Sequence, residues 1–272
     1  MVLIVGCGYV GTCIGLALQP KYPVVVTARS QKSLAYLKSL FPFVEHLDTS
    51  NLEEFHERIL QHDTLILTLA AQDATSYETT YLETAKNLSA LLKNNSSIKH
   101  IVYTSSTSVY GEHEGKVVEE STPTLALSPQ GKILVETENT LLSLANPQRK
   151  IVIFRLGEIY GPGREISKRV LGYQGRSVPG DGSFPTNMTH VEDIARATLY
   201  ALEHDLSGVF NLVDDEHMTR FDLYKTLCQK LNLPLLSWNL SQKTHHSSNK
   251  IVSNTKIKNA GFAFKFLKRE MI

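Results

Sequence analysis

A chain of 272 residues with 42% apolar and 20% charged composition can bury one large core, or a core and a small second lobe, which excludes a disordered protein. A net charge of +1 provides no positive field for nucleic acid or an anionic membrane, so we expect a small-molecule ligand. Three cysteines without paired spacing indicate free thiols, and no basic leader or anchor precedes the early glycines, so we expect a cytoplasmic protein.

Short β-branched runs alternate with helical patterns along the first two thirds of the chain, the order that a parallel sheet with crossover helices requires. Two of the helices have capping-box spacing at their starts, one beginning at Ser50 and the other at Thr189. We therefore expect an α/β fold, a Rossmann-type doubly wound parallel sheet. The predicted strands are Val2–Val5, Val24–Thr27, Phe43–Leu47, Thr64–Leu69, His100–Thr104, Ile151–Arg155 and Val209–Leu212.

The alternation fails in two stretches in which Gly, Pro, Ser and Lys accumulate. These stretches, 157–188 and 213–272, predict a smaller substrate-binding lobe. The dinucleotide-binding domain is predicted to span 1–156 and to be completed by 189–212. The Lys and Ser enrichment near the C-terminal end is typical of a solvated surface.

A glycine-rich turn follows the first predicted strand and leads into an apolar helical stretch. In that setting the first glycine makes a tight turn, the second lets the backbone approach a pyrophosphate, and the third lets helix and strand pack closely. The alternative is that these glycines serve only the turn. Cys7 is expected to be a small filler in the loop. The predicted contacts with the dinucleotide are Gly6, Cys7, Gly8, Tyr9, Val10 and Gly11.

The end of the second strand indicates the type of dinucleotide. An NAD-specific site normally has an Asp or Glu there, about 20 residues after the turn, but this chain has no acidic residue before Glu45. Arg29, followed by Ser30, offers a guanidinium to a 2′-phosphate, so we expect NADP, with NAD as the alternative. Otherwise Arg29 is an exposed charge at a helix start. Asp48 either accepts from the adenine amine or caps the next helix. Contacts from the end of the fourth strand are expected at Leu69, Ala70 and Ala71.

A fifth strand runs into a hydroxyl-rich turn, Ser105 to Gly111, at the carboxyl edge where open parallel sheets bind ligands. Further on, the sequence reads RLGEIYGPGR from Arg155 to Arg164 and HVED from His190 to Asp193. Together with the glycine-rich turn, these motifs resemble the extended short-chain dehydrogenases/reductases, the NAD-dependent nucleotide-sugar epimerases and dehydratases. The resemblance extends over most of the chain and implies an NAD(P)-dependent enzyme.

The resemblance also implies roles for single residues. Ser106, four residues before Tyr110, matches the family's group that polarises the substrate oxygen. The family's catalytic Y-x-x-x-K pair falls on Ser128 and Lys132, so the lysine is kept and the tyrosine is replaced. This departure resembles the atypical subgroup of the family. Lys132 is expected to hydrogen-bond the nicotinamide ribose, or is a solvated helix lysine. Ser128 before Pro129 is typical of a helix N-cap and cannot replace a phenol as a general base near neutral pH.

Three outcomes follow from the missing tyrosine. Another group takes the proton, with Tyr110, Tyr160 and Glu158 as candidates, and Tyr110 is our first choice for a catalytic role. Alternatively, the chain binds the cofactor without turnover. The third outcome is slow catalysis that uses the bound cofactor and Ser106 alone.

The lobe supplies the predicted substrate contacts, which are Tyr160, Arg164 and Arg176. The two arginines are expected to face an anionic substrate such as a nucleotide diphosphate, unless they only belong to a surface loop. The family often has an arginine two residues before His190, where this chain has Met188, and this difference weakens the case for a nucleotide sugar.

No metal site is predicted, because His245 and His246 stand without Cys/His ligand spacing or an HExxH motif. The leading hypothesis is an NADP(H)-dependent oxidoreductase, epimerase or dehydratase that acts on a hydroxyl or carbonyl of a small substrate. The alternative is a non-catalytic module that senses NADP(H) and reports to a partner. A homodimer is left open.

Overall fold

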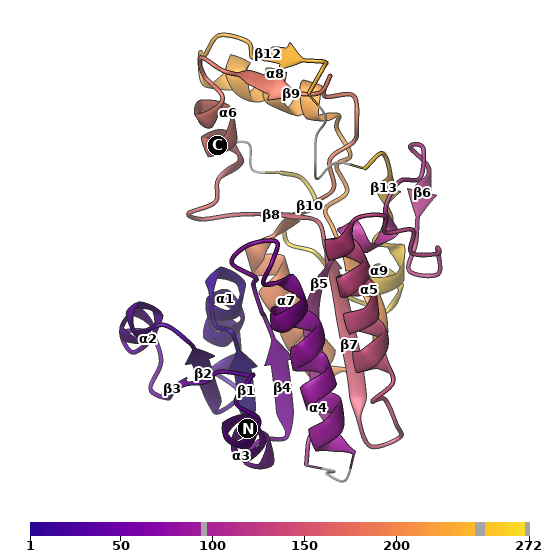
Figure 1. Cartoon of the computed structure of the whole chain (residues 1–272). Coiled ribbons are helices and arrows are strands. Elements are labelled where there is room, and N and C mark those ends of the chain that lie inside the picture. The colour runs from indigo at the N-terminus through magenta and orange to yellow at the C-terminus, as the bar shows by residue number, and fades with distance from the viewer. Residues whose placement is uncertain (94–96, 243–247, 270–272) are drawn as a thin grey trace.

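The computed structural model describes residues 1–93, 97–242 and 248–269. Its centre is a seven-stranded parallel sheet with the order β11-β7-β5-β4-β1-β2-β3, covered by helices on both faces (Figure 1). Two halves run outward from β1 and β4, the order of a doubly wound Rossmann sheet, which confirms the predicted fold class. The strands are β1 (Val2–Val5), β2 (Val24–Ala28), β3 (Val44–His46), β4 (Thr64–Leu67), β5 (His100–Ser106), β7 (Lys150–Leu156) and β11 (Gly208–Leu212).

Alternate side chains of each buried strand enter different cores. In β1, Val2 and Ile4 join one core with α1 (Tyr9–Leu18), α2 (Gln31–Leu37) and α7 (Val191–Glu203). Leu3 and Val5 point to the opposite core, because successive side chains of a strand alternate between faces. The helices on that face are α3 (Leu52–Leu60), α4 (Thr84–Leu92) and α5 (Pro129–Leu142), with a π-helical turn η1 (Glu78–Glu83) before α4.

Both predicted capping boxes are wrong by one residue. The cap of α3 is Asn51, whose Oδ1 accepts from the Glu54 amide at 3.3 Å, because the Ser50 hydroxyl donates to Asp48 instead. The cap of α7 is His190, since the Thr189 hydroxyl accepts from the Gly157 amide at 2.8 Å and donates to a β11 carbonyl. The capping-box spacing predicts where a helix starts, but the competing hydrogen bonds of its side chains decide which residue caps it.

The smaller lobe stands beyond the carboxyl edge of the sheet, at the top of Figure 1. Its own core contains Val170, Val178, Leu223 and Leu227. Two paired strands, β8 (Glu158–Tyr160) and β10 (Met188–His190), join it to the sheet. The lobe contains α6 (Ile166–Gly172), β9 (Ser177–Pro179), α8 (Arg220–Lys230) and β12 (Ser237–Asn239).

The predicted lobe segment 213–272 is divided in the structure. After β12 the chain pairs β13 (Ile251–Val252) with β6 (Val117–Val118) and forms α9 (Thr255–Asn259). Ile257 and Phe262 then pack in the same core as β1, so this part belongs to the dinucleotide domain. In the described residues, no helix is both long enough and apolar enough to cross a membrane.

Candidate functional site

The three glycines of the turn between β1 and α1 differ in what surrounds them. Gly6 has a φ of +78°, which glycine adopts without steric cost. A Cβ on Gly11 would lie 2.5 Å from the Thr68 hydroxyl, so this position must be glycine for α1 to approach the sheet. A Cβ on Gly8 would meet nothing closer than the Gly6 carbonyl oxygen at 4.0 Å. The space above Gly8 is therefore open, as a cradle for a ligand requires.

The start of α1 adds free donors to this space. Gly8 is the N-cap and provides no side-chain cap, and the first turn contains no acidic residue. The amides of Tyr9, Val10 and Gly11 belong to the first turn, whose donors have no partner within the helix. Cys7 is buried, and burial raises the pKa of its thiol to about 11, so it stays protonated at neutral pH. This arrangement fits the pyrophosphate of a dinucleotide.

The other predicted cofactor residues lie along the same edge of the sheet. Leu69 packs on the turn, with its Cα 3.3 Å from where a Cβ of Gly6 would stand, and exposed Ala70 follows it. The Ala71 amide donates to the Tyr81 hydroxyl at 3.3 Å.

The end of β2 presents Arg29 to solvent. Ser30 caps α2, and its Oγ accepts from the Ser33 amide at 3.1 Å. Asp48 accepts from the amide and hydroxyl of Ser50, and these two bonds lower the pKa of its carboxyl, with the charge of Arg29 adding to the effect. Asp48 thus stabilises the turn before α3 and lies near Arg29.

Ser106 ends β5 at the carboxyl edge, where it is half-buried and its Oγ accepts from the Ser108 amide at 3.1 Å. This bond caps the 3₁₀ turn η2 (Thr107–Tyr110). Lys132 is exposed on α5 and lines a cavity of about 220 Å³ with Thr124 and Ala126. Within the described part of the chain, no hydrogen bond joins Ser106 to Lys132.

Ser128 is the N-cap of α5, as predicted. Its Oγ accepts from the Gly131 amide at 3.1 Å, and Pro129 occupies the first turn. Its hydroxyl oxygen is therefore used by the helix start.

Two of the three residues expected to exchange the proton are buried. Tyr110 is fully buried, its hydroxyl donates to Asn211 Oδ1 at 2.8 Å, and the Arg155 guanidinium lies 4.7 Å from its ring centre. Tyr110 therefore belongs to the core, which speaks against our first choice. Tyr160 is also buried; its hydroxyl has no partner among the described residues, and burial raises its pKa. Glu158 is exposed and lies in a cavity.

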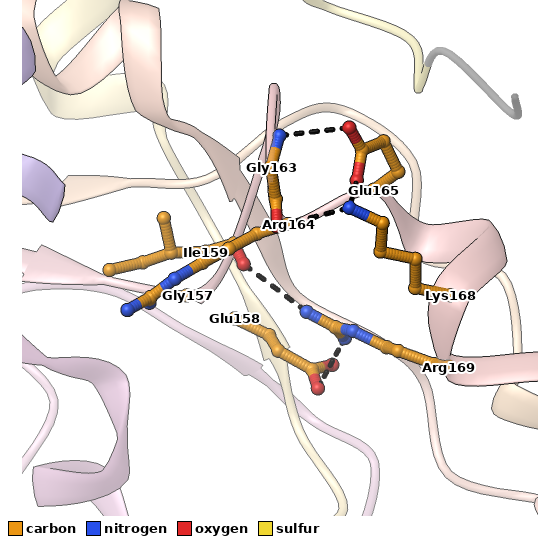
Figure 2. A pocket seen from close by; sticks show the side chains of 8 residues that line it. All are labelled: Gly157, Glu158, Ile159, Gly163, Arg164, Glu165, Lys168 and Arg169. Atoms are coloured by element: carbon orange, nitrogen blue, oxygen red, sulfur yellow. Dashed lines mark hydrogen bonds and ion pairs between the residues drawn. The ribbon is translucent and has the colours of Figure 1, made fainter. Parts of the chain in front are cut away.

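That cavity has a volume of about 550 Å³ and is lined by β8, the turn that follows it and the start of α6 (Figure 2). Glu158 forms an ion pair with Arg169, whose guanidinium also donates to the Ile159 carbonyl at 3.2 Å. Arg176, a predicted substrate contact, is exposed and outside this lining, as is the buried Tyr160. The lining residues are Gly157, Glu158, Ile159, Gly163, Arg164, Glu165, Lys168 and Arg169.

Known proteins resemble this chain in sequence and in fold. The model of the NAD dependent epimerase/dehydratase family matches residues 2–212, which include the turn, Ser106, Lys132 and β8. The chain belongs to this family. Protein YeeZ of Escherichia coli strain K12 is 29% identical over 245 residues, covering 85% of this chain and 84% of that protein.

Solved structures share the fold of this epimerase/dehydratase chain. The dTDP-glucose 4,6-dehydratase of Bacillus anthracis in complex with NAD has a TM-score of 0.82 at 20% identity, covering 97% of this chain and 91% of that chain. The human epimerase family protein SDR39U1 with NADPH has a TM-score of 0.78 at 17% identity, covering 98% and 96%.

A buried lysine and a buried ion pair of this family member were not predicted from the sequence. Lys250 lies in the stretch expected to be solvated, yet it is 4% exposed and its ammonium donates to the Gly111 carbonyl at 3.3 Å and to Ser248. Burial lowers its pKa to about 8. Arg155 pairs with Glu138 at 2.7 Å beneath the hydroxyl-rich turn. The Tyr110–Gly111 motif does not indicate that Lys250 or the Arg155–Glu138 pair packs beside it.

Among the described residues, no group of three or more His, Cys, Asp or Glu side chains is placed to hold a metal ion. His245 and His246 lie outside the described residues.

Proposed function

We propose that the chain is an NAD(P)-dependent oxidoreductase, epimerase or dehydratase acting on a hydroxyl or carbonyl of a small substrate. The observation that carries the proposal is the open space above Gly8, beside the uncapped start of α1. Ser106 ends β5 at the same edge of the sheet, so a dinucleotide held there extends toward a hydroxyl donor.

Each group has a part in this proposal. The cofactor, when bound, supplies hydride transfer. The amides of Tyr9 and Val10 hold its pyrophosphate, and Lys132 donates to the nicotinamide ribose. Ser106 donates a hydrogen bond to the substrate oxygen. Glu158 takes over the proton exchange, because it is the candidate whose carboxylate lines the larger cavity.

We also propose a preference for NADP over NAD. Arg29 is exposed at the end of β2, where its guanidinium is open to a 2′-phosphate. The solved relatives include one protein with NAD and one with NADPH, so both cofactors occur on this fold.

The predicted substrate contacts differ in exposure. Tyr160 is buried, so we do not propose it as a substrate contact, whereas Arg176 is exposed and is proposed as a surface contact for an anionic substrate.

The test is turnover of NADPH or NADP on a panel of nucleotide sugars and small carbonyl compounds. Ser106→Ala and Lys132→Ala are each expected to lower kcat by about 10²- to 10⁴-fold, because each removes a positioned polar group. Ser108→Ala is the matched control, since it removes an exposed hydroxyl two residues away and leaves turnover unchanged. Equal activity of Ser106→Ala and wild type would contradict the proposed role of Ser106.

A second candidate function has its own observation in favour. Ser128, which we align with the family's acid/base tyrosine, is engaged as a helix cap, and Tyr110 is buried. A non-catalytic NADP(H) sensor fits this arrangement. Wild-type protein that binds NADPH, turns over no substrate of the panel and changes its oligomeric state on binding would favour the sensor over the enzyme.

A further inference from the structure

The larger cavity contains three cations, and two of them are already neutralised. Lys168 pairs with Glu165 at 2.6 Å, and Arg169 pairs with Glu158. Glu165 also accepts from the Gly163 amide at 2.8 Å, so its carboxylate is fully engaged. These contacts leave one cation of the lining, Arg164, for a ligand.

The Arg164 guanidinium has a different environment. In the part of the chain that the structure describes, no ion pair or hydrogen bond engages its side chain, and Figure 2 shows it pointing away from the two ion pairs. Its Cζ lies 4.4 Å from the centre of the Tyr9 ring. A cation held over an aromatic face keeps its N–H donors in the plane of the guanidinium available for an anion.

Tyr9 connects this cation with the cofactor turn. It is the first residue of α1, and its amide lies beside the open space above Gly8. Its ring extends beneath the lobe, where a Cβ on Gly161 would stand 3.1 Å from the Tyr9 hydroxyl and 2.8 Å from Val191. The turn Gly161–Arg164 therefore covers Tyr9 closely and places the Arg164 guanidinium at the start of α1.

We infer that Arg164 binds the cofactor's pyrophosphate, so that the lobe closes the dinucleotide site from the side opposite the glycine-rich turn. The inference rests on the proposed function and replaces the expectation that Arg164 binds substrate. A guanidinium adds a full positive charge to the backbone amides of the turn and matches phosphate oxygens with paired donors. Tyr9 acts as a positioning residue, which holds the guanidinium through its ring.

The experiment compares the dissociation constants of NADPH, NADH, ADP-ribose and adenosine 2′-monophosphate for wild type and Arg164→Gln. Loss of Arg164 is expected to weaken NADPH, NADH and ADP-ribose by a common factor of about 10- to 100-fold, less at high salt. Adenosine 2′-monophosphate has no pyrophosphate, so its affinity is expected to stay unchanged. Lys168→Gln, which removes a paired cation of the same cavity, is the matched control and is expected to leave all four constants unchanged.

Tyr9→Leu keeps the backbone amide and removes the ring, so it tests the positioning role. It is expected to weaken the same three ligands by a smaller factor and to have no further effect in combination with Arg164→Gln. If Arg164→Gln binds the dinucleotides as tightly as wild type, the inference is overturned while the proposed function stands. This holds whether or not the KM for the substrate rises. Wild type that binds neither dinucleotide would instead overturn the proposed function, and this inference with it.

Discussion

Hydroxyl groups near the carboxyl edge of the sheet differ in what surrounds them. Ser106 accepts one backbone bond and is half-buried, whereas the Tyr110 hydroxyl is enclosed and bonded to Asn211 of β11. Ser128 is used by the start of α5. The sequence predicted that the turn with Ser106 and Tyr110 lies at this edge and that Ser128 caps a helix. Which hydroxyl faces a ligand depends on packing across β11 and α5, which the motif does not encode.

Arg29→Ala tests the proposed cofactor preference. Loss of the guanidinium is expected to weaken NADPH about 10- to 100-fold and to leave NADH unchanged, because only NADPH has a 2′-phosphate for a charge-assisted hydrogen bond. Dissociation constants from fluorescence titration check this. Lys32→Ala, an exposed cation of the following helix, serves as the control. An unchanged ratio of the two affinities would show that Arg29 is not the phosphate ligand.

Lys250 predicts an unusual dependence of stability on pH. Its pKa is about 8 in the fold and 10.5 in the reference state, so the buried ammonium costs stability at pH 7. Between pH 8 and 10.5 the unfolded chain keeps the proton that the folded chain has lost, and stability rises. Lys250→Met is therefore expected to gain about 1 to 3 kcal/mol at pH 7.

Urea unfolding of both proteins at several pH values measures this gain. The advantage of Lys250→Met is expected to shrink as the pH rises from 8 to 10.5. A variant less stable than wild type at pH 7, or a difference that does not change with pH, would contradict the account. The burial of Lys250 could not be predicted from the sequence, because the residue lies in a polar stretch and its contacts with Gly111 and Ser248 form only in the fold.

The glycine-rich turn is the element whose structure followed most directly from sequence. A strand, three spaced glycines and an apolar helix specify the connection; Gly6 and Gly11 have local steric reasons, whereas the space above Gly8 is open. The seven strands were predicted for a similar reason, since buried parallel strands form continuous β-branched runs. Helix starts were less accurate, because Ser50 and Thr189 have partners outside their helices.

Two alanine variants separate ligand space from packing space in this turn. Gly8→Ala is expected to unfold like wild type and to weaken both dinucleotides at least about 10-fold, because its methyl group enters the open space. Gly11→Ala is expected to lose about 1 to 3 kcal/mol of stability, because its methyl group overlaps the Thr68 hydroxyl. Titration and urea unfolding check the pair. Gly8→Ala with unchanged affinity would exclude a ligand above Gly8.

The whole molecule is tied together near its C-terminal end. The Arg269 side chain is fully buried and donates to Asp214 at 2.7 Å and to the Thr186 carbonyl at 3.0 Å. Thr186 precedes β10 and Asp214 follows β11, so Arg269 connects the last described residues with both segments that join sheet and lobe. The predicted lobe boundary missed this return of the chain, because Ile257 reaches the sheet's core through long-range contacts that composition does not reveal.

Arg269→Met is expected to lower the free energy of unfolding by about 3 to 5 kcal/mol, because it leaves the Asp214 carboxylate buried without its partner. The half-exposed pair Lys258–Asp215 gives a matched control, and Lys258→Met is expected to cost less than about 1 kcal/mol. Urea unfolding compares the two variants. Equally small losses of unfolding free energy in Arg269→Met and Lys258→Met would show that the buried Arg269–Asp214 pair does not hold the C-terminal segment in place.

The central claim is that the glycine-rich turn and the start of α1 bind a nicotinamide dinucleotide through its pyrophosphate. Isothermal titration calorimetry of the cofactor-free chain with NADPH and with NADH tests it most directly. We predict saturable binding of one dinucleotide per chain, tighter for NADPH and markedly weakened in Gly8→Ala. Absence of binding heat with both dinucleotides at several temperatures would contradict it.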